Sequence, residues 1–168
     1  MDLTKFDNPL IMVHRGYQAR YPENTMVSFL AAVEAGAQFV DLEVTLTRDQ
    51  NVVVMHDDTI DRTTNGSGRV SDHDLDALQR LDSGNWFDPR FAGERIPSLK
   101  EVLEQVAPKA YIKIEIKAHQ STDPESIGQV EQKVIDVVTA KRAQKRVLIS
   151  SFDPEVLKKI KQLDPAMD

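Results

Sequence analysis

The sequence predicts an α/β barrel that is incomplete, with about five of the eight strands that such a barrel contains. Short apolar segments typical of buried strands alternate along the chain with amphipathic segments typical of helices, which indicates a parallel sheet covered by helices. Two of these strands also carry charged residues on the face away from the helices. That face is apolar in a central strand of an open sheet, but in a barrel it lines the mouth. The 168 residues predict a single domain, spanning residues 1–168.

The predicted strands span about residues 10–14, 39–46, 52–56, 111–117 and 146–152. Four longer helices are predicted to begin at side chains that can cap them: Asn24 or Thr25, Ser98, Asp123 and Asp153. Residues 59–97 are irregular, with many turn-forming residues and one short helix near residues 74–81. We refer to them as the 59–97 segment, and they include the single tryptophan, Trp86.

The composition excludes several functional classes. The formal net charge of −6 disfavours binding to nucleic acid or to anionic membranes. The absence of cysteine excludes disulfides and thiolate metal sites. The first residues lack a basic region followed by an apolar core, and no apolar run approaches the ~20 residues of a membrane span, so we expect no signal peptide, no integral membrane segment and a cytoplasmic location.

The strand at residues 39–46 carries two carboxylates on one face. Side chains alternate along a strand, so Asp41 and Glu43 point one way while the even-numbered apolar residues point the other. Two like charges ~6–7 Å apart on one face repel each other, and a divalent cation between them would remove the repulsion. An isolated Asp-x-Glu is more often a solvated edge strand, so its interpretation depends on the other residues that reach this face.

Five more reactive residues fall at strand ends or on inward faces: His14, Arg15, His56, Glu115 and Lys117. Three carboxylates with only oxygen donors suggest Mg²⁺ or Ca²⁺. A histidine pair can act as general acid and base near neutral pH, and an arginine and a lysine beside a metal suggest an anionic substrate such as a phosphate ester. Together these residues predict phosphoryl-transfer hydrolysis, and the alternative is a barrel interior of mutually neutralising salt bridges.

Several segments resemble the glycerophosphodiester phosphodiesterase family, in order and over nearly the whole chain. They are His14-Arg15-Gly16, Pro22-Glu23-Asn24-Thr25, Asp41-Leu42-Glu43-Val44, the run from His56 to Gly66, Gly84-Asn85-Trp86-Phe87, Ile96-Pro97-Ser98-Leu99, Glu115-Ile116-Lys117 and Ser150-Ser151-Phe152. The resemblance implies a TIM-type (β/α) barrel. It also implies a role in lipid and glycerol metabolism, namely hydrolysis of small glycerophosphodiesters, such as glycerophosphocholine or glycerophosphoethanolamine, to sn-glycerol 3-phosphate and an alcohol, usually with Ca²⁺ or Mg²⁺.

The resemblance also implies roles for individual residues. Asp41, Glu43 and Glu115 would be the metal ligands. His14 and His56 would be the acid–base pair. Arg15 and Lys117 would bind the phosphate. Asn24 would support the site. Trp86, in a family insertion near the barrel mouth that corresponds to the 59–97 segment, would line the alcohol pocket or serve only in packing.

The chain departs from the family pattern in two respects. The usual strand order is Glu-x-Asp, whereas this chain has Asp41-x-Glu43, which favours Ca²⁺ because its coordination shell is the more flexible one. In addition, a complete barrel usually needs about 250 residues. We therefore expect the domain to be C-terminally truncated relative to the family. The chain would then be a fragment, a chain that a second chain completes, or a shortened variant. Its open sheet edges would favour self-association. The alternative functions are a catalytically silent metal- or phosphate-binding fragment and a related phospholipase-type phosphodiesterase.

Overall fold

The computed structural model describes residues 9–117 and 129–167, in which five strands form one sheet. The strands are β1 (Met12–His14), β2 (Phe39–Leu46), β3 (Val52–Val54), β4 (Tyr111–Ile116) and β5 (Val147–Ser150). Four of them follow the order β1-β2-β4-β5, and each neighbouring pair in this order is parallel. The sheet is open, since in the described residues β1 pairs only with β2 and β5 only with β4. The predicted α/β class and incomplete barrel are confirmed.

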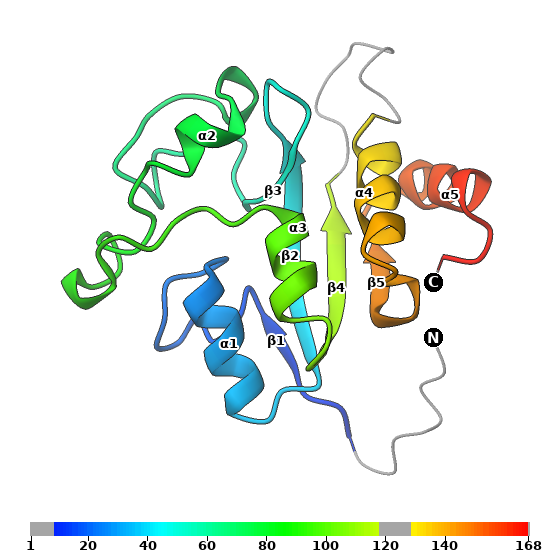
Figure 1. Ribbon diagram of the computed structural model, residues 1–168, viewed down its shortest axis with the longest axis horizontal. Helices are drawn as coiled ribbons and strands as arrows, with labels where there is room; N and C mark the ends of the chain where they lie inside the picture. The colour runs from blue at the N-terminus through cyan, green and yellow to red at the C-terminus, as the bar shows by residue number, and fades with distance from the viewer. Residues whose placement is uncertain (1–8, 118–128, 168) are drawn as a thin grey trace.

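The direction of β3 differs from the parallel series expected from the sequence. β3 pairs with β2 in the antiparallel direction, with Val44 opposite Val54. Parallel strands need a crossover of a dozen or more residues, and only residues 47–51 separate β2 from β3. The short turn therefore makes a hairpin, and β3 lies off the path of the parallel strands (Figure 1).

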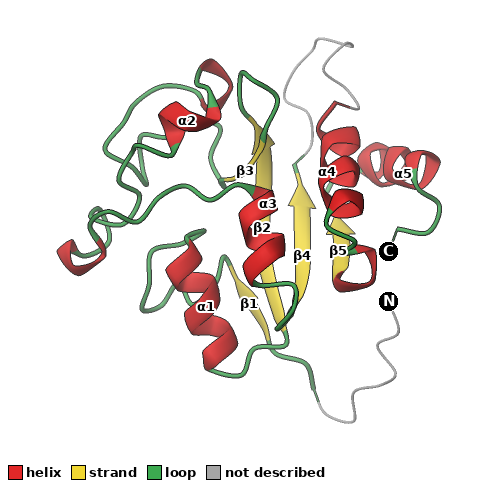
Figure 2. Ribbon diagram, in the orientation of Figure 1, coloured by secondary structure: helices red, strands yellow, loops and turns green. Residues whose placement is uncertain are grey.

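The helices begin where the sequence predicted capping residues, as far as the described residues extend. α1 (Met26–Glu34) is capped by Thr25, α3 (Leu99–Gln105) by a capping box of Ser98 and Glu101, and α5 (Pro154–Leu163) by Asp153. α4 spans Gln129–Ala140, and its predicted cap, Asp123, lies outside the described residues. Figure 2 shows α1, α3 and α4 on the same face of the strands. No helix in residues 9–117 and 129–167 has the length and apolar character needed to cross a bilayer.

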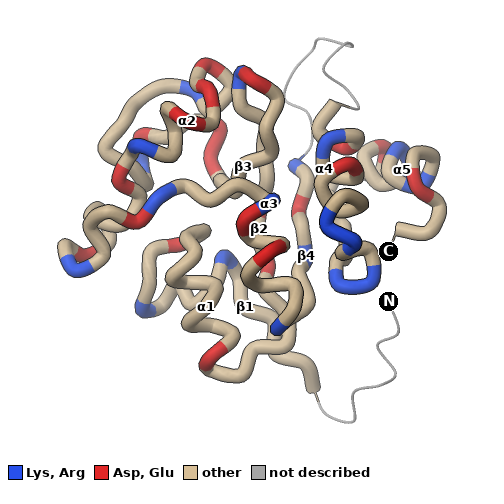
Figure 3. The backbone as a smooth tube through the Cα atoms, in the orientation of Figure 1, with Lys and Arg blue, Asp and Glu red and all other residues tan. Residues whose placement is uncertain are grey.

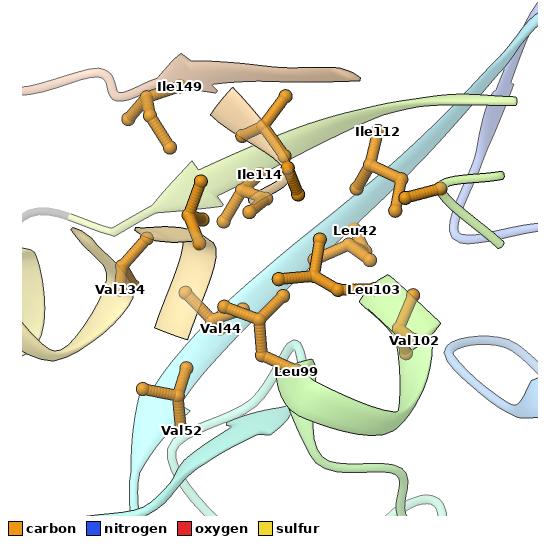
Figure 4. Close-up of a cluster of buried hydrophobic side chains, with 14 of the residues drawn as sticks. Leu42, Val44, Val52, Leu99, Val102, Leu103, Ile112, Ile114, Val134 and Ile149 are labelled. Carbon is orange, nitrogen blue, oxygen red and sulfur yellow. The ribbon is translucent and has the colours of Figure 1, made fainter. Parts of the chain in front are cut away.

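The main core lies between this face of the sheet and the helices. In Figure 4 side chains of β2 and β4 point toward those of α3 and α4, and all of those labelled there are buried, among them Leu42, Ile114, Leu99 and Val134. Full burial of one such side chain contributes about 1.5–3 kcal/mol. The even-numbered positions of β2 and β4 therefore fix the sheet against the helices, and the odd-numbered positions are left to face the other way.

The 59–97 segment has a smaller apolar cluster of its own. It contains the short helix α2 (Leu75–Leu78) and two 3₁₀ turns, η2 (Val70–Asp72) and η3 (Pro89–Phe91); a third turn, η4 (Gln144–Arg146), precedes β5. The buried residues of the cluster are Val53, Met55, Ile60, Val70, Leu78 and Ile96. Because two of them belong to β3 and the residue that follows it, the cluster joins the segment to the sheet beside the carboxyl end of β2.

Candidate active site

The charged face of the sheet is organised in rows by strand register. His14 of β1 lies opposite Asp41 of β2, and Asp41 lies opposite Lys113 of β4. In the next row Glu43 lies opposite Glu115. Figure 3 shows acidic and basic positions alternating along β4. The face predicted from the Asp-x-Glu pattern is therefore present, and it carries cations as well as carboxylates.

Asp41 has a partner at each carboxylate oxygen. Its Oδ2 lies 2.9 Å from Nδ1 of His14, and its Oδ1 accepts a hydrogen bond of 3.0 Å from the Lys113 ammonium. The Asp41 side chain is only 8% exposed, whereas that of His14 is 51% exposed. Since Nδ1 of His14 is engaged, Nε2 is the ring nitrogen through which this exposed imidazole can exchange a proton with a ligand.

Glu43 is buried and is held by two side chains from the segment that follows β1. Its Oε1 accepts from Nε of Arg15 and its Oε2 from Nδ2 of Asn24, each at 2.9 Å. Both donors have left-handed backbone conformations, with φ of 55° at Arg15 and 56° at Asn24. Such conformations cost roughly 1–2 kcal/mol for most residues other than glycine. The contacts to Glu43 and a backbone hydrogen bond from Asn24 N to Arg15 O, at 3.0 Å, hold the two residues in place.

A chain of ion pairs links Arg15 to His56. Arg15 contacts Glu23 at 3.1 Å, Glu23 accepts from both terminal nitrogens of Arg62 at 2.8 and 3.0 Å, and Nε of Arg62 donates to Asp57 at 2.6 Å. The other oxygen of Asp57 lies 2.6 Å from Nδ1 of His56. Both histidines therefore have a carboxylate at Nδ1, and Arg62 connects the 59–97 segment to the loop after β1.

These contacts shift the pKa of both acidic residues in the chain. The hydrogen bond from Arg62, with a smaller contribution from His56, outweighs burial and lowers the pKa of Asp57 to about 2. Burial alone would raise the pKa of Glu23, but hydrogen bonds and charge from Arg62 and Arg15 outweigh it, so this pKa is lowered. Both carboxylates are therefore ionised at neutral pH, and each can hold its cationic neighbours in position.

Two of the remaining predicted residues, Glu115 and Lys117, lie at the carboxyl end of β4. The Lys117 ammonium donates to the backbone carbonyl of His56, which places this lysine beside the second histidine. Glu115 is mostly buried, and one of its oxygens lies 3.8 Å from the Lys113 ammonium. Trp86 instead packs within its own loop: its ring meets Phe87 edge to face and its N–H donates to the Ser83 carbonyl.

Four residues of this network were not singled out from the sequence: Glu23, Asp57, Arg62 and Lys113. The first three lie within segments that carry the family resemblance, so their charge was a signal that could have been used. Lys113 sits two residues before Glu115 on the same strand face. Its position opposite Asp41 depends on strand register across 72 residues, which a single sequence does not show.

The three carboxylates predicted as metal ligands have the donor chemistry that Ca²⁺ or Mg²⁺ requires, because all three supply oxygen. In the part of the chain that the structure describes, however, no three His, Asp or Glu side chains converge as ligands of one ion. Instead Asp41 and Glu115 share Lys113, and Glu43 is paired with Arg15. The three carboxylates therefore suit a hard cation, and in this structure they are paired with the side chains of Lys113 and Arg15.

Comparison with known proteins identifies the family of this chain. A model of the glycerophosphoryl diester phosphodiesterase family matches residues 14–168, which extend from the first histidine of the site to the last residue. The chain belongs to this family. A glycerophosphodiester phosphodiesterase of Caldanaerobacter subterraneus is 42% identical over 157 residues, and the match covers 93% of this chain and 63% of the relative. A glycerophosphodiester phosphodiesterase of Bacillus subtilis is 35% identical over 173 residues, and the match covers 95% of this chain and 57% of the relative.

Solved structures of the family have the same fold. The glycerophosphodiester phosphodiesterase of Agrobacterium tumefaciens superimposes with a TM-score of 0.84 at 31% identity, covering 95% of this chain and 65% of that one. A phosphodiesterase of Oleispira antarctica, in complex with the product sn-glycerol-3-phosphate, gives 0.87 at 30% identity, covering 95% and 64%. The chain thus spans under two thirds of the length of these relatives, in agreement with its open sheet.

Proposed function

We propose that this chain carries the catalytic residues of a phosphoric diester hydrolase that cleaves glycerophosphodiesters to sn-glycerol 3-phosphate and an alcohol. The observation that carries the proposal is the pair of histidines, each with a carboxylate at Nδ1: Asp41 beside His14 and Asp57 beside His56. A carboxylate at one ring nitrogen fixes the orientation of the imidazole and stabilises its protonated form. The Oleispira relative, whose structure holds sn-glycerol-3-phosphate, supports the choice of product.

The two histidines would act as general base and general acid. One removes the proton from the attacking glycerol hydroxyl or water as the other protonates the departing alkoxide. Lys117, beside His56, and Arg15 would bind the phosphate oxygens. Because Arg15 already donates to Glu43 and Glu23, its guanidinium is held in one orientation before substrate arrives.

Asp41, Glu43 and Glu115 would hold a divalent cation, and such an ion neutralises negative charge on a phosphodiester. The Asp-x-Glu order of the first two favours Ca²⁺ over Mg²⁺, because Ca²⁺ tolerates a wider range of ligand positions. Asn24, through its hydrogen bond to Glu43, would keep that carboxylate oriented.

The experiment is a coupled assay for glycerol 3-phosphate released from glycerophosphocholine by the whole chain, with added Ca²⁺ and with a chelator. We expect His14→Ala and His56→Ala each to lower kcat by about 10²–10⁴-fold, the usual contribution of general acid–base catalysis. His73→Ala is the matched control, because His73 lies away from the site and its ring contacts the Ser67 carbonyl. Undiminished activity in the His14→Ala/His56→Ala double variant would contradict the proposal.

The alternative functions also make distinct predictions. A silent binding module is favoured by the open edges at β1 and β5 in the described residues. It would bind glycerol 3-phosphate in calorimetry without turnover, and its open edges would promote self-association in sedimentation experiments. A phospholipase-type enzyme would instead release its products from a panel of lysophospholipids and phosphatidylinositol.

A further inference from the structure

Lys113 lies between two of the carboxylates that are proposed to hold a metal. Its ammonium is 3.0 Å from Oδ1 of Asp41 on the neighbouring strand and 3.8 Å from Oε2 of Glu115 on its own strand. The lysine side chain is 22% exposed, and the two carboxylates are 8% and 14% exposed. Three charges are thus held close together where solvent screening is weak.

We propose that the Lys113 ammonium competes with a divalent cation for Asp41 and Glu115, so that a metal ion binds only when the lysine withdraws. This inference rests on the proposed function, since it concerns the carboxylates of that site. An ammonium hydrogen and a metal ion both use the lone pairs of a carboxylate oxygen, and two cations within a few ångströms repel each other. The flexible four-carbon stem of lysine allows the ammonium to move away.

The other cations of the site differ from Lys113 in their partners. Arg15 contacts Glu43 but is also paired with Glu23, which is not a proposed ligand. His14 contacts the oxygen of Asp41 opposite to the one that Lys113 uses. Both ion pairs of Lys113, in contrast, are with proposed ligands. Lys113 is therefore the residue whose removal should change metal affinity most directly.

The test compares Lys113→Met, Lys113→Arg and Lys145→Met with the unchanged chain, by calorimetric titration of chelator-treated protein with Ca²⁺ and with Mg²⁺. Methionine keeps most of the apolar stem and removes the charge, whereas arginine keeps the charge. Lys145 is exposed in the turn before β5, so its replacement controls for the change in net charge alone. We expect Lys113→Met to bind Ca²⁺ at least about tenfold more tightly, equivalent to about 1.4 kcal/mol. The other two variants should stay within about threefold of the unchanged chain.

Thermal unfolding supplies a second measurement that needs no catalysis. Without metal, Lys113→Met should have a lower Tm, because Asp41 and Glu115 lose their shared cation. At one saturating Ca²⁺ concentration its Tm should rise more than that of the unchanged chain, since the stabilisation by a ligand grows with the logarithm of its affinity. Equal or weaker Ca²⁺ binding by Lys113→Met would overturn the inference, as would the absence of Ca²⁺ binding in every variant at millimolar concentration. If Lys113→Met binds Ca²⁺ no more tightly while the unchanged chain still releases glycerol 3-phosphate, the inference is refuted and the proposed hydrolase activity remains supported.

Discussion

Replacing Asp57 by asparagine tests the ion-pair chain that orients His56. The Asp57 side chain is 27% exposed, and its carboxylate contacts Arg62 and His56, both at 2.6 Å. Its pKa is about 2 in the folded protein, against 3.8 for an unperturbed aspartate. One unit of pKa is about 1.36 kcal/mol, so this depression corresponds to roughly 2 kcal/mol of folding free energy at neutral pH. We therefore expect Asp57→Asn to lower the free energy of unfolding at pH 7 by about 2 kcal/mol.

The same pKa determines how stability depends on pH. Because the folded-state pKa of Asp57 is depressed, its stabilisation is fully present above pH 3.8 and is lost as the pH falls toward 2. Urea unfolding at pH 7, 4 and 2.5 should show the unchanged chain and Asp57→Asn converging at the lowest pH. Asp58→Asn is the matched control, since this neighbour is exposed and carries the same charge. Equal stability of Asp57→Asn and the unchanged chain at pH 7, or an equal loss of stability in Asp58→Asn, would refute this role of the Asp57 carboxylate. Asp57→Asn should also lower kcat by about 10–100-fold, a fraction of the usual acid–base contribution, with little change in KM.

Three further predictions concern the supports of the site. Gly16→Ala should destabilise the fold by about 1–3 kcal/mol and reduce activity, because φ is 81° and the added Cβ would lie 2.4 Å from Oγ of Ser28. Gly36→Ala is the control for the backbone cost alone, because Gly36 has a φ of 93° and open space around it. Equal losses of stability in the two variants would refute the clash with Ser28. Ile114→Ala should cost about 2–5 kcal/mol in urea unfolding because its side chain is fully buried between the sheet and the helices, whereas the more exposed Leu157→Ala should cost far less. In a double-mutant cycle, Glu23→Gln and Arg62→Met should show a coupling energy of about 0.5–3 kcal/mol, and additive losses would show that the ion pair is energetically unimportant.

The sequence was most informative where local rules decide the outcome. Alternation along residues 39–46 placed Asp41 and Glu43 on one face, and capping residues such as Ser98 marked the helix starts that the structure shows. The direction of β3 was missed although the short turn before it determines that direction. The left-handed backbone at Arg15 and Asn24 could not be anticipated, because neither residue is glycine and each is held by contacts from distant parts of the chain.

Burial and charge together explain why the site contains as many cations as it does. Three carboxylates on one sheet face would repel one another, and burying unpaired charges costs free energy. The strand register supplies Lys113 beside Asp41, and the loop after β1 supplies Arg15 beside Glu43, so the carboxylates are paired with side-chain cations. The consequence is a compromise. The contacts that pair and orient the carboxylates are also the contacts that a divalent cation must replace. Arg15 is less easily replaced than Lys113, because Arg15 is also paired with Glu23. Metal affinity in this chain should therefore depend on the cations of the site as much as on its carboxylates.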